Sequence, residues 1–305
     1  MRTLRITIVL FLLAAVALSS AAPAVASSHK SKAIVFVHGL DAIGTCPQTD
    51  GDATWNDMKR ALNDWGWAGG GKNLDVAYYK CDKNYAHWIN HHGSHGKHSA
   101  SGHVLKKDGT CCAHTQDTSI RHLGYHWAWY VRDHFGSRCI EAVGHSMGGL
   151  IIRYGLAQVQ RDHSAFPGSI CVQDVVTFGT PHGGTLATFV CGWLQCEQQR
   201  GGSAFLDWLR NHAWEPDGSG GTDWTVIGSY DDFPVDEDSA VNMGASHKVK
   251  YLGSNNIGHS DYMHRTRTVE DADVYWKNKP DPWYACYDCA WPVLWAERAL
   301  WAVNQ

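Results

Sequence analysis

Residues 139–156 read CIEAVGHSMGGLIIRYGL, and three kinds of pattern follow one another in this short stretch. Ile140, Ala142 and Val143 form an apolar run that is typical of a buried parallel strand, and a glycine-rich break begins at Gly144. From Leu150 onward, apolar residues recur at helical spacing. The stretch therefore predicts a strand, a sharp turn and a helix in immediate succession.

The turn contains the pattern G-x-S-x-G, with Ser146 at its centre. A sharp strand-to-helix turn strains the backbone of its central residue, and glycines two positions away remove the Cβ atoms that would collide there. The Ser146 hydroxyl would then project from the end of the strand, with helix amide groups close behind it. This context predicts that Ser146 is a nucleophile, although the motif alone is a weak signal in a chain with 31 glycines.

Two further motifs flank this turn, VFVHG at residues 35–39 and TFGTPHGG at residues 177–184. Together with GHSMGG they resemble the secreted bacterial lipase and esterase branch of the α/β-hydrolase superfamily, over about residues 33–265. The resemblance implies an α/β fold with a mostly parallel central sheet flanked by helices. It also implies a Ser-His-Asp triad, carboxylic ester substrates and no cofactor.

The same resemblance assigns the oxyanion hole to two main-chain amides. The residue after His-Gly donates one N–H and the residue after the nucleophile donates the other, which implies Leu40 and Met147. His38 is expected to brace its loop, and His182, within the TPHGG turn, is expected to be structural.

The acid and the base of the triad are sought after later strands. The strand expected at residues 224–228 is followed by Asp231 and Asp232, and the family spacing through Val235 favours Asp232, with Asp231 as the alternative. His259 follows what is expected to be the last strand, at residues 248–252, and His264 is its alternative. The chain order Ser146, Asp232, His259 is the order used by this superfamily.

The first 26 residues predict a signal peptide, since a basic start precedes an apolar run and a small-residue cleavage site. The run is shorter than the roughly 18 to 20 residues that cross a bilayer, so we expect no stable membrane insertion once the signal is removed. Residues 27–305 are expected to form one catalytic domain of a secreted, extracellular monomer, with a possible cap within residues 185–222. A net charge of −4 provides no basic excess that would indicate a nucleic-acid partner.

Ten cysteines in an exported chain favour up to five disulfides. Cys139 and Cys171 each precede a strand, and these two strands should be neighbours, so this pair is expected to be bridged. Cys191 with Cys196, and Cys286 with Cys289, would close local loops. The spacing of Cys286 and Cys289 also suits a zinc ligand pair, but no second matching pair is present.

Two other segments invite interpretation. Residues 84–115 carry a histidine cluster (His87, His91, His92, His95, His98 and His103), which we interpret as a solvated loop, with a metal site as the alternative. We expect no metal at the triad. Aromatic residues gather after Asp281, and most are expected to pack on the sheet while some could present rings to lipid or an insoluble polyester.

The resulting hypothesis is a secreted carboxylic ester hydrolase that acts on an ester or lipid through an acyl-enzyme. The alternatives are a phospholipase, a transacylase or a polyester depolymerase using the same triad. A binding protein on a scaffold that has lost catalysis is a further alternative. Acyl chain length is not expressed in the sequence pattern.

Overall fold

The structure is a computed structural model that describes residues 30–40, 50–67, 74–77, 119–186 and 191–301. Its centre is an eight-stranded sheet in the order β2-β1-β3-β4-β5-β6-β7-β8. Neighbouring strands from β2 to β6 pair in parallel, whereas β7 and β8 are antiparallel. The strands are β1 (Ile34–Val37), β2 (Leu74–Ala77), β3 (Ile140–His145), β4 (Val172–Phe178), β5 (Asp223–Ser229), β6 (His247–Tyr251), β7 (Glu270–Trp276) and β8 (Trp283–Cys289).

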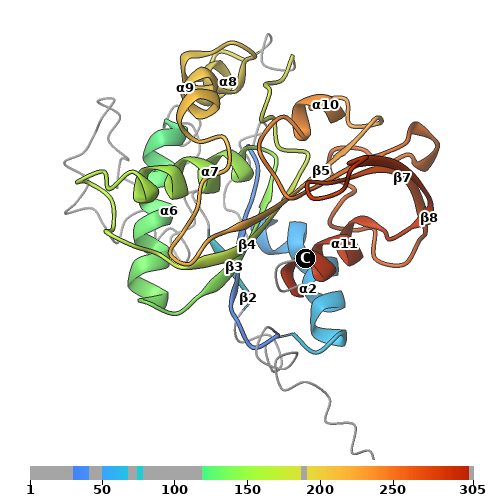
Figure 1. Ribbon diagram of the computed structural model, residues 1–305, viewed down its shortest axis with the longest axis horizontal. Coiled ribbons are helices and arrows are strands. Elements are labelled where there is room, and N and C mark those ends of the chain that lie inside the picture. Colours follow the sequence, from blue (N-terminus) through green and yellow to red (C-terminus); the bar gives the residue numbers. More distant parts are fainter. Residues whose placement is uncertain (1–29, 41–49, 68–73, 78–118, 187–190, 302–305) are drawn as a thin grey trace, which may run out of the picture.

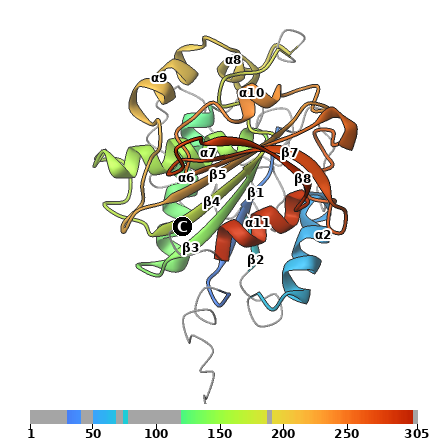
Figure 2. The same ribbon diagram turned by 45° about the vertical axis from the view of Figure 1, so that its right-hand side comes forward.

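Helices cover both faces of the sheet, as Figures 1 and 2 show. On one face α7 lies against β1, β3 and β4, and α6 packs outside it, while α2 and α11 lie on the other face. The described helices are α2 (Asp50–Asp64), α6 (Ile120–Phe135), α7 (Met147–Gln160), α8 (Leu194–Gln199), α9 (Ala204–His212), α10 (Glu237–Ala240) and α11 (Pro292–Trp301), with a 3-10 turn, η2 (Gly253–Asn255).

The core forms where sheet and helices meet. Both β1 and β3 are buried along their whole length, which explains the continuous apolar run of β1 and the mostly apolar sequence of β3. The helix α7 is enclosed between the sheet and α6, and each residue from Met147 to Val159 is buried. Burying a helix on all sides ties the turn that precedes it to the centre of the molecule.

The predicted α/β architecture is confirmed. The helix α2 begins at Asp50, and Ser119 caps α6 by accepting a hydrogen bond from the Arg121 amide. The prediction that residues 248–252 form the last strand is wrong, because β7 and β8 follow. Only alternate residues of β7 are buried, so its apolar signal is half as dense as that of an inner strand.

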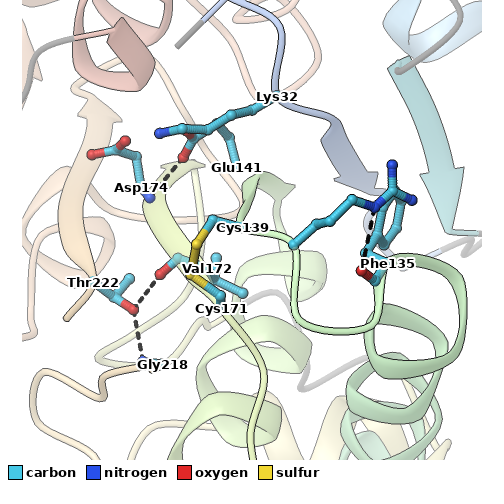
Figure 3. The surroundings of a disulfide bond; sticks show 10 residues. Lys32, Phe135, Cys139, Glu141, Cys171, Val172, Asp174, Gly218 and Thr222 are labelled. Atoms are coloured by element: carbon cyan, nitrogen blue, oxygen red, sulfur yellow. Dashed lines mark hydrogen bonds and ion pairs between the residues drawn. A yellow bond between two sulfur atoms is a disulfide. The ribbon is translucent and has the colours of Figure 1, made fainter. Parts of the chain in front are cut away.

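Three disulfides lie within the described residues, and all three pairings agree with the sequence prediction. Cys139 and Cys171 are joined across the starts of β3 and β4, with Cα atoms 4.4 Å apart. Figure 3 shows this bridge near the side chains of Lys32, Glu141 and Asp174, of which Glu141 and Asp174 are buried. The other two bridges join Cys191 with Cys196 and Cys286 with Cys289. Cys46, Cys81, Cys111 and Cys112 lie outside the described residues.

Candidate active site

Ser146 stands between the end of β3 and the start of α7, with φ 54° and ψ −130°. A positive φ is strained for a residue with a Cβ atom, and such strain persists only where the surroundings enforce it. The flanking glycines provide the space for the turn. A Cβ atom on Gly144 would lie 2.6 Å from the Gly149 nitrogen, and one on Gly148 would lie 2.1 Å from the Val37 oxygen. The spacing of G-x-S-x-G is therefore a steric requirement here.

The His38-Gly39 turn passes directly over Ser146. A Cβ atom on Gly39 would lie 2.6 Å from the Ser146 Cβ, so only glycine fits at this position. Leu40 follows and lines the same pocket as Ser146, while Met147 is the first residue of α7. The first amide groups of a helix have no partner within the helix, which leaves the Met147 N–H able to receive negative charge. The oxyanion roles of Leu40 and Met147 stay predictions.

The side chains of Ser146, His259 and Asp232 form one chain of hydrogen bonds. The Ser146 Oγ lies 2.9 Å from His259 Nε2, and His259 Nδ1 lies 2.9 Å from both oxygens of Asp232. Because a carboxylate can only accept, the His259 proton belongs on Nδ1, and Nε2 accepts from the Ser146 hydroxyl. The Asp232 side chain is fully buried, whereas the His259 side chain is 20% exposed. Asp232 lies in the loop after β5 and His259 in the loop after η2.

The two alternative residues, His264 and Asp231, have other hydrogen-bond partners. His264 Nδ1 is 2.7 Å from the Asp57 carboxylate on α2, and both side chains are partly exposed. The amide of Asp231 donates to the Ser229 hydroxyl, and the carboxylate that reaches His259 is that of its neighbour, Asp232. Of the two acid candidates and two base candidates, the fold brings Asp232 and His259 to Ser146.

His145, the variable residue before Ser146 in the motif, contacts the loop that carries the base. Its Nε2 lies 2.7 Å from the His259 carbonyl oxygen. Burial lowers the pKa of His145 to about 3, and the neighbouring His259 contributes in the same direction. A neutral ring facing a carbonyl carries its proton on the facing nitrogen, so the His145 Nε2–H donates to the His259 oxygen. This bond ties the base loop to the end of β3.

His182 lies behind the site, as the sequence interpretation expected of a structural residue. Arg153 on α7 is buried and donates to the Ala213 and Leu209 carbonyl oxygens. Its Nη1 also lies 3.3 Å from His182 Nδ1, which therefore accepts, while His182 Nε2 lies 3.2 Å from the Thr177 hydroxyl. Burial, followed by the charge of Arg153, lowers the pKa of His182 well below its ordinary value. His182 is thus a neutral connector.

Two donors that the sequence interpretation missed bind the Asp232 carboxylate. The Val235 amide donates to Asp232 Oδ1 over 3.1 Å, and the Tyr262 hydroxyl donates to Asp232 Oδ2 over 2.9 Å. Burial, then the Asp232 charge, raises the pKa of Tyr262 well above its ordinary value, so the phenol keeps its proton. Tyr262 and Asp232 are 30 positions apart in the chain, and no local pattern announces such a contact.

A pocket of about 220 Å³ opens onto Ser146 and His259. Most of its walls are polar, since four imidazoles and three hydroxyl groups face it. Its lining residues are His38, Gly39, Leu40, Thr54, His145, Ser146, His259, Ser260, Met263 and His264. In this arrangement a small electrophilic carbon can reach the Ser146 hydroxyl while His259 keeps its hydrogen bond to that hydroxyl.

The parallel strands β1, β3, β4, β5 and β6, with a serine on the turn between β3 and α7, form the arrangement that the motifs implied. Asp232 follows β5 and His259 follows β6, so the order of the three residues along the chain is serine, aspartate, histidine. The protein has the α/β-hydrolase fold.

One protein-family model matches part of the chain. Residues 86–198 match the family model described as "Putative serine esterase (DUF676)", a segment that includes Ser146 and covers a minority of the chain. No curated protein matches the sequence significantly.

Solved structures similar to this hydrolase fold share little sequence with it. Phospholipase PlaB from Legionella pneumophila, in complex with thio-NAD, is 14% identical, with 65% of this chain and 37% of PlaB covered and a TM-score of 0.38. The chain thus spans little more than a third of PlaB. The mature lipase BlEst2 from Bacillus licheniformis is 17% identical, with 69% and 79% covered and a TM-score of 0.41. The lin2722 gene product of Listeria innocua is 10% identical, with 90% and 96% covered and a TM-score of 0.43.

Some further predicted features lie within the described residues and others lie outside them. The helix α9 packs against α7 through the buried Phe205, Leu206 and Leu209, and the described residues that line the pocket come from other segments, so a cap within residues 185–222 stays a prediction. The histidine cluster at His87–His103 and the signal peptide lie outside the described residues. The described helices include none that is long and apolar enough to cross a membrane.

The aromatic residues after Asp281 divide as expected into packed and exposed groups. Trp291 and Trp295 pack against the core, whereas Trp283, Tyr284 and Tyr287 are exposed on the edge strand β8. Cys286 and Cys289, whose spacing also suited zinc, are bonded to each other.

Proposed function

We propose that this protein hydrolyses carboxylic esters through an acyl-enzyme formed on Ser146. The observation that carries the proposal is the chain of 2.9 Å contacts from Ser146 through His259 to Asp232, at the wall of an open pocket. The serine-esterase model that matches the segment around Ser146 supports the same activity.

The proposed reaction begins when His259 Nε2 removes the proton of the Ser146 hydroxyl as Oγ attacks the acyl carbon. Asp232 accepts the His259 Nδ1–H and stabilises the imidazolium that forms. The amides of Leu40 and Met147 would hold the oxyanion. His259 then gives its proton to the departing alcohol. A water molecule, deprotonated by the same nitrogen, releases the acid and restores Ser146. No cofactor takes part in these steps.

The polar pocket favours short or polar acyl groups over long alkyl chains. Each methylene of a bound acyl chain contributes about 0.8 kcal/mol only if it leaves water for an apolar wall. Among the described residues that line this pocket, Leu40 and Met263 alone provide sizeable apolar surface, whereas histidines and hydroxyl groups provide most of the rest. We therefore place a short-chain esterase before the phospholipase, transacylase and polyester depolymerase alternatives.

The test is hydrolysis of a p-nitrophenyl ester series from acetate to palmitate. Wild type is expected to prefer acetate or butyrate, and Ser146→Ala is expected to lose at least about 10⁴-fold in kcat because the nucleophile is gone. Ser254→Ala is the matched control, since Ser254 is exposed on η2 and does not line the pocket. An optimum at long acyl chains would support a lipase or phospholipase instead.

Labelling by a fluorophosphonate separates catalysis from binding. The probe is expected to modify Ser146 in the folded chain and to leave Ser146→Ala unmodified. If folded wild type takes up no label and hydrolyses none of the esters, the protein is a binding module on this fold and the proposal fails.

We also propose that the mature chain acts outside the cell as a monomer. Three disulfides within the described residues support an oxidising compartment. Export of the full chain, with cleavage after Ala26 read by mass spectrometry of the secreted product, is the measurement that tests the signal peptide.

A further inference from the structure

The Asp232 carboxylate is held by more than its contact with His259. Its Oδ1 accepts the Val235 amide and its Oδ2 accepts the Tyr262 hydroxyl, so each oxygen has one donor besides the histidine. Two donors on opposite oxygens determine the plane of the carboxylate. His259 Nδ1 then lies equally far from both oxygens, at 2.9 Å.

Tyr262 is itself rigidly placed. Its side chain is completely buried, and its ring stacks on Phe178 with centroids 5.7 Å apart and an interplanar angle of 26°. The carbonyl oxygen of Phe178 accepts the Ser146 N–H over 2.9 Å, so the residue that supports Tyr262 also supports the nucleophile. Side chains held in this way lose little further freedom when the reaction proceeds.

The residue after Phe178 leaves room for this arrangement. Gly179 has φ +50°, and a Cβ atom there would lie 2.5 Å from Asp232 Oδ2, 3.0 Å from Tyr262 Cε2 and 3.1 Å from His259 Nδ1. The absence of a side chain at Gly179 therefore leaves the space in which Asp232, His259 and Tyr262 meet.

We propose that Tyr262 is a positioning residue of the triad, whose hydroxyl orients the Asp232 carboxylate and sets how tightly the Asp232–His259 pair holds its proton. The inference rests on the proposed function. Only in a triad that works by proton transfer does the proton affinity of the Asp232–His259 pair affect the reaction rate.

The direction of the effect follows from the hydrogen bond. A donor to a carboxylate stabilises its charged form and makes it a weaker base. Burial keeps the phenol of Tyr262 protonated, so this donor is present throughout the working pH range. Without it, the carboxylate would attract the His259 proton more strongly. The pair would then lose its proton only at higher pH.

The test is Tyr262→Phe, which removes the hydroxyl and keeps the ring that stacks on Phe178. We expect kcat/KM for p-nitrophenyl acetate to fall about tenfold, which equals about 1.4 kcal/mol. We also expect the acid limb of its pH profile to move upward by about half a pH unit or more. A residue with only a structural role would lower the activity without moving this limb.

Tyr251→Phe is the matched control. Tyr251 is also completely buried, and its hydroxyl donates to the Ala290 carbonyl oxygen over 2.8 Å rather than to the triad. Tyr251→Phe also removes a phenol oxygen from a completely buried position. This variant is therefore expected to lose stability while keeping the wild-type acid limb.

A second variant covers the case in which Tyr262→Phe does not fold. Site-specific 3-fluorotyrosine at position 262 keeps the hydroxyl and makes it a stronger donor, so the acid limb is expected to move downward. If neither variant moves the limb in folded protein, Tyr262 is structural and the inference is overturned.

The pH at which the His259 ring takes up its proton, followed by NMR in the full chain, gives a readout that does not depend on turnover. If wild type hydrolyses no ester, the proposed function fails. A rise of this pH in Tyr262→Phe would still support the inference about the hydrogen bond, and an unchanged value would refute it.

Discussion

At the scale of single residues, the site depends on glycines, whose lack of a Cβ atom leaves space for neighbouring groups. Ser146 adopts a positive φ because Gly144 and Gly148 leave its turn free of Cβ atoms, and Gly39 leaves room above it. Gly179 does the same for the acid and the base. Each of these glycines faces backbone or a group of the triad, which cannot move aside without changing the geometry of the site.

Gly179→Ala is therefore expected to reduce kcat/KM by at least about 100-fold, since a shift of about 1 Å in catalytic groups has an effect of that size. The new methyl group would meet Asp232 Oδ2, and the positive φ adds roughly 1 kcal/mol of strain. Ester hydrolysis and thermal unfolding are the measurements. Gly168→Ala is the control, because nothing lies within 4 Å of a Cβ atom there. Equal activity of both variants would show that the triad tolerates displacement.

At the scale of secondary-structure elements, the two ends of the parallel strands carry different features. Their carboxyl ends bear the loops with Ser146, Asp232 and His259, as the general rule for ligand sites in such sheets predicts. Their opposite ends bear the bridge between Cys139 and Cys171, near the partly buried Lys32 and the buried Glu141 and Asp174 (Figure 3). The disulfide and the proposed active site thus lie at opposite edges of the same strands.

Replacing both cysteines, as in Cys139→Ala with Cys171→Ala, is expected to lower the free energy of unfolding by about 3 kcal/mol. The bridge spans 32 residues, and closing such a loop restricts the unfolded chain. Urea unfolding measures the loss, while kcat at a temperature where the variant stays folded should change by less than about twofold. The control is the double replacement of Cys191 and Cys196, whose separation of 5 predicts a smaller loss. A large fall in kcat for the first variant would contradict the separation of the two edges.

At the scale of the whole molecule, stability is coupled to pH through a row of three carboxyl groups, two of them buried. Glu141 on β3, Asp174 on β4 and Asp223 on β5 occupy paired positions on neighbouring strands. Lys32 forms an ion pair with Glu141 over 2.7 Å, and the Glu141 Oε2 accepts the Asp174 amide. Burial, followed by the Glu141 charge, raises the pKa of Asp174 to about 9, so Asp174 is protonated in the folded protein at neutral pH.

The sign of the pH dependence follows from this shift. The pKa of Asp174 is higher in the folded chain than its ordinary value of 3.8, so the folded state holds the extra proton between these limits. Its contribution to the free energy of unfolding is complete below the lower limit and declines as the pH rises toward the upper one. Because one pH unit between these limits corresponds to about 1.4 kcal/mol, we expect the loss between pH 5 and pH 8 to be at most about 4 kcal/mol.

Asp174→Asn removes this titration and keeps the shape of the side chain. The variant is expected to gain stability relative to wild type as the pH rises, measured by urea unfolding at pH 5 and pH 8. Asp207→Asn is the control, because Asp207 is exposed and pairs only with Arg210 at the surface. A difference between wild type and Asp174→Asn that is the same at both pH values would refute the account.

Much of this architecture was already expressed in local patterns. The buried runs of β1 and β3, the glycines around Ser146 and the pairing of Cys139 with Cys171 were predicted, because strand period, turn sterics and neighbouring strand starts are short-range properties. Asp232 and His259 could be named only with the help of family spacing. The antiparallel strands β7 and β8 were missed, since exposed edge strands carry a weak apolar signal.

Other features depend on contacts between distant parts of the chain. Among nineteen histidines, residue type alone could not single out His259, and it was preferred over His264 and His182 from its position after a strand and from the family pattern. Only the structure shows that His259 contacts Ser146, whereas His182 contacts Arg153 and His264 contacts Asp57. Tyr262 and Gly179 reach Asp232 only when three loops meet at one edge of the sheet. Local propensity acts over a few residues, whereas the orientation of a triad depends on packing across more than a hundred, and for that reason the tertiary structure alone decided it.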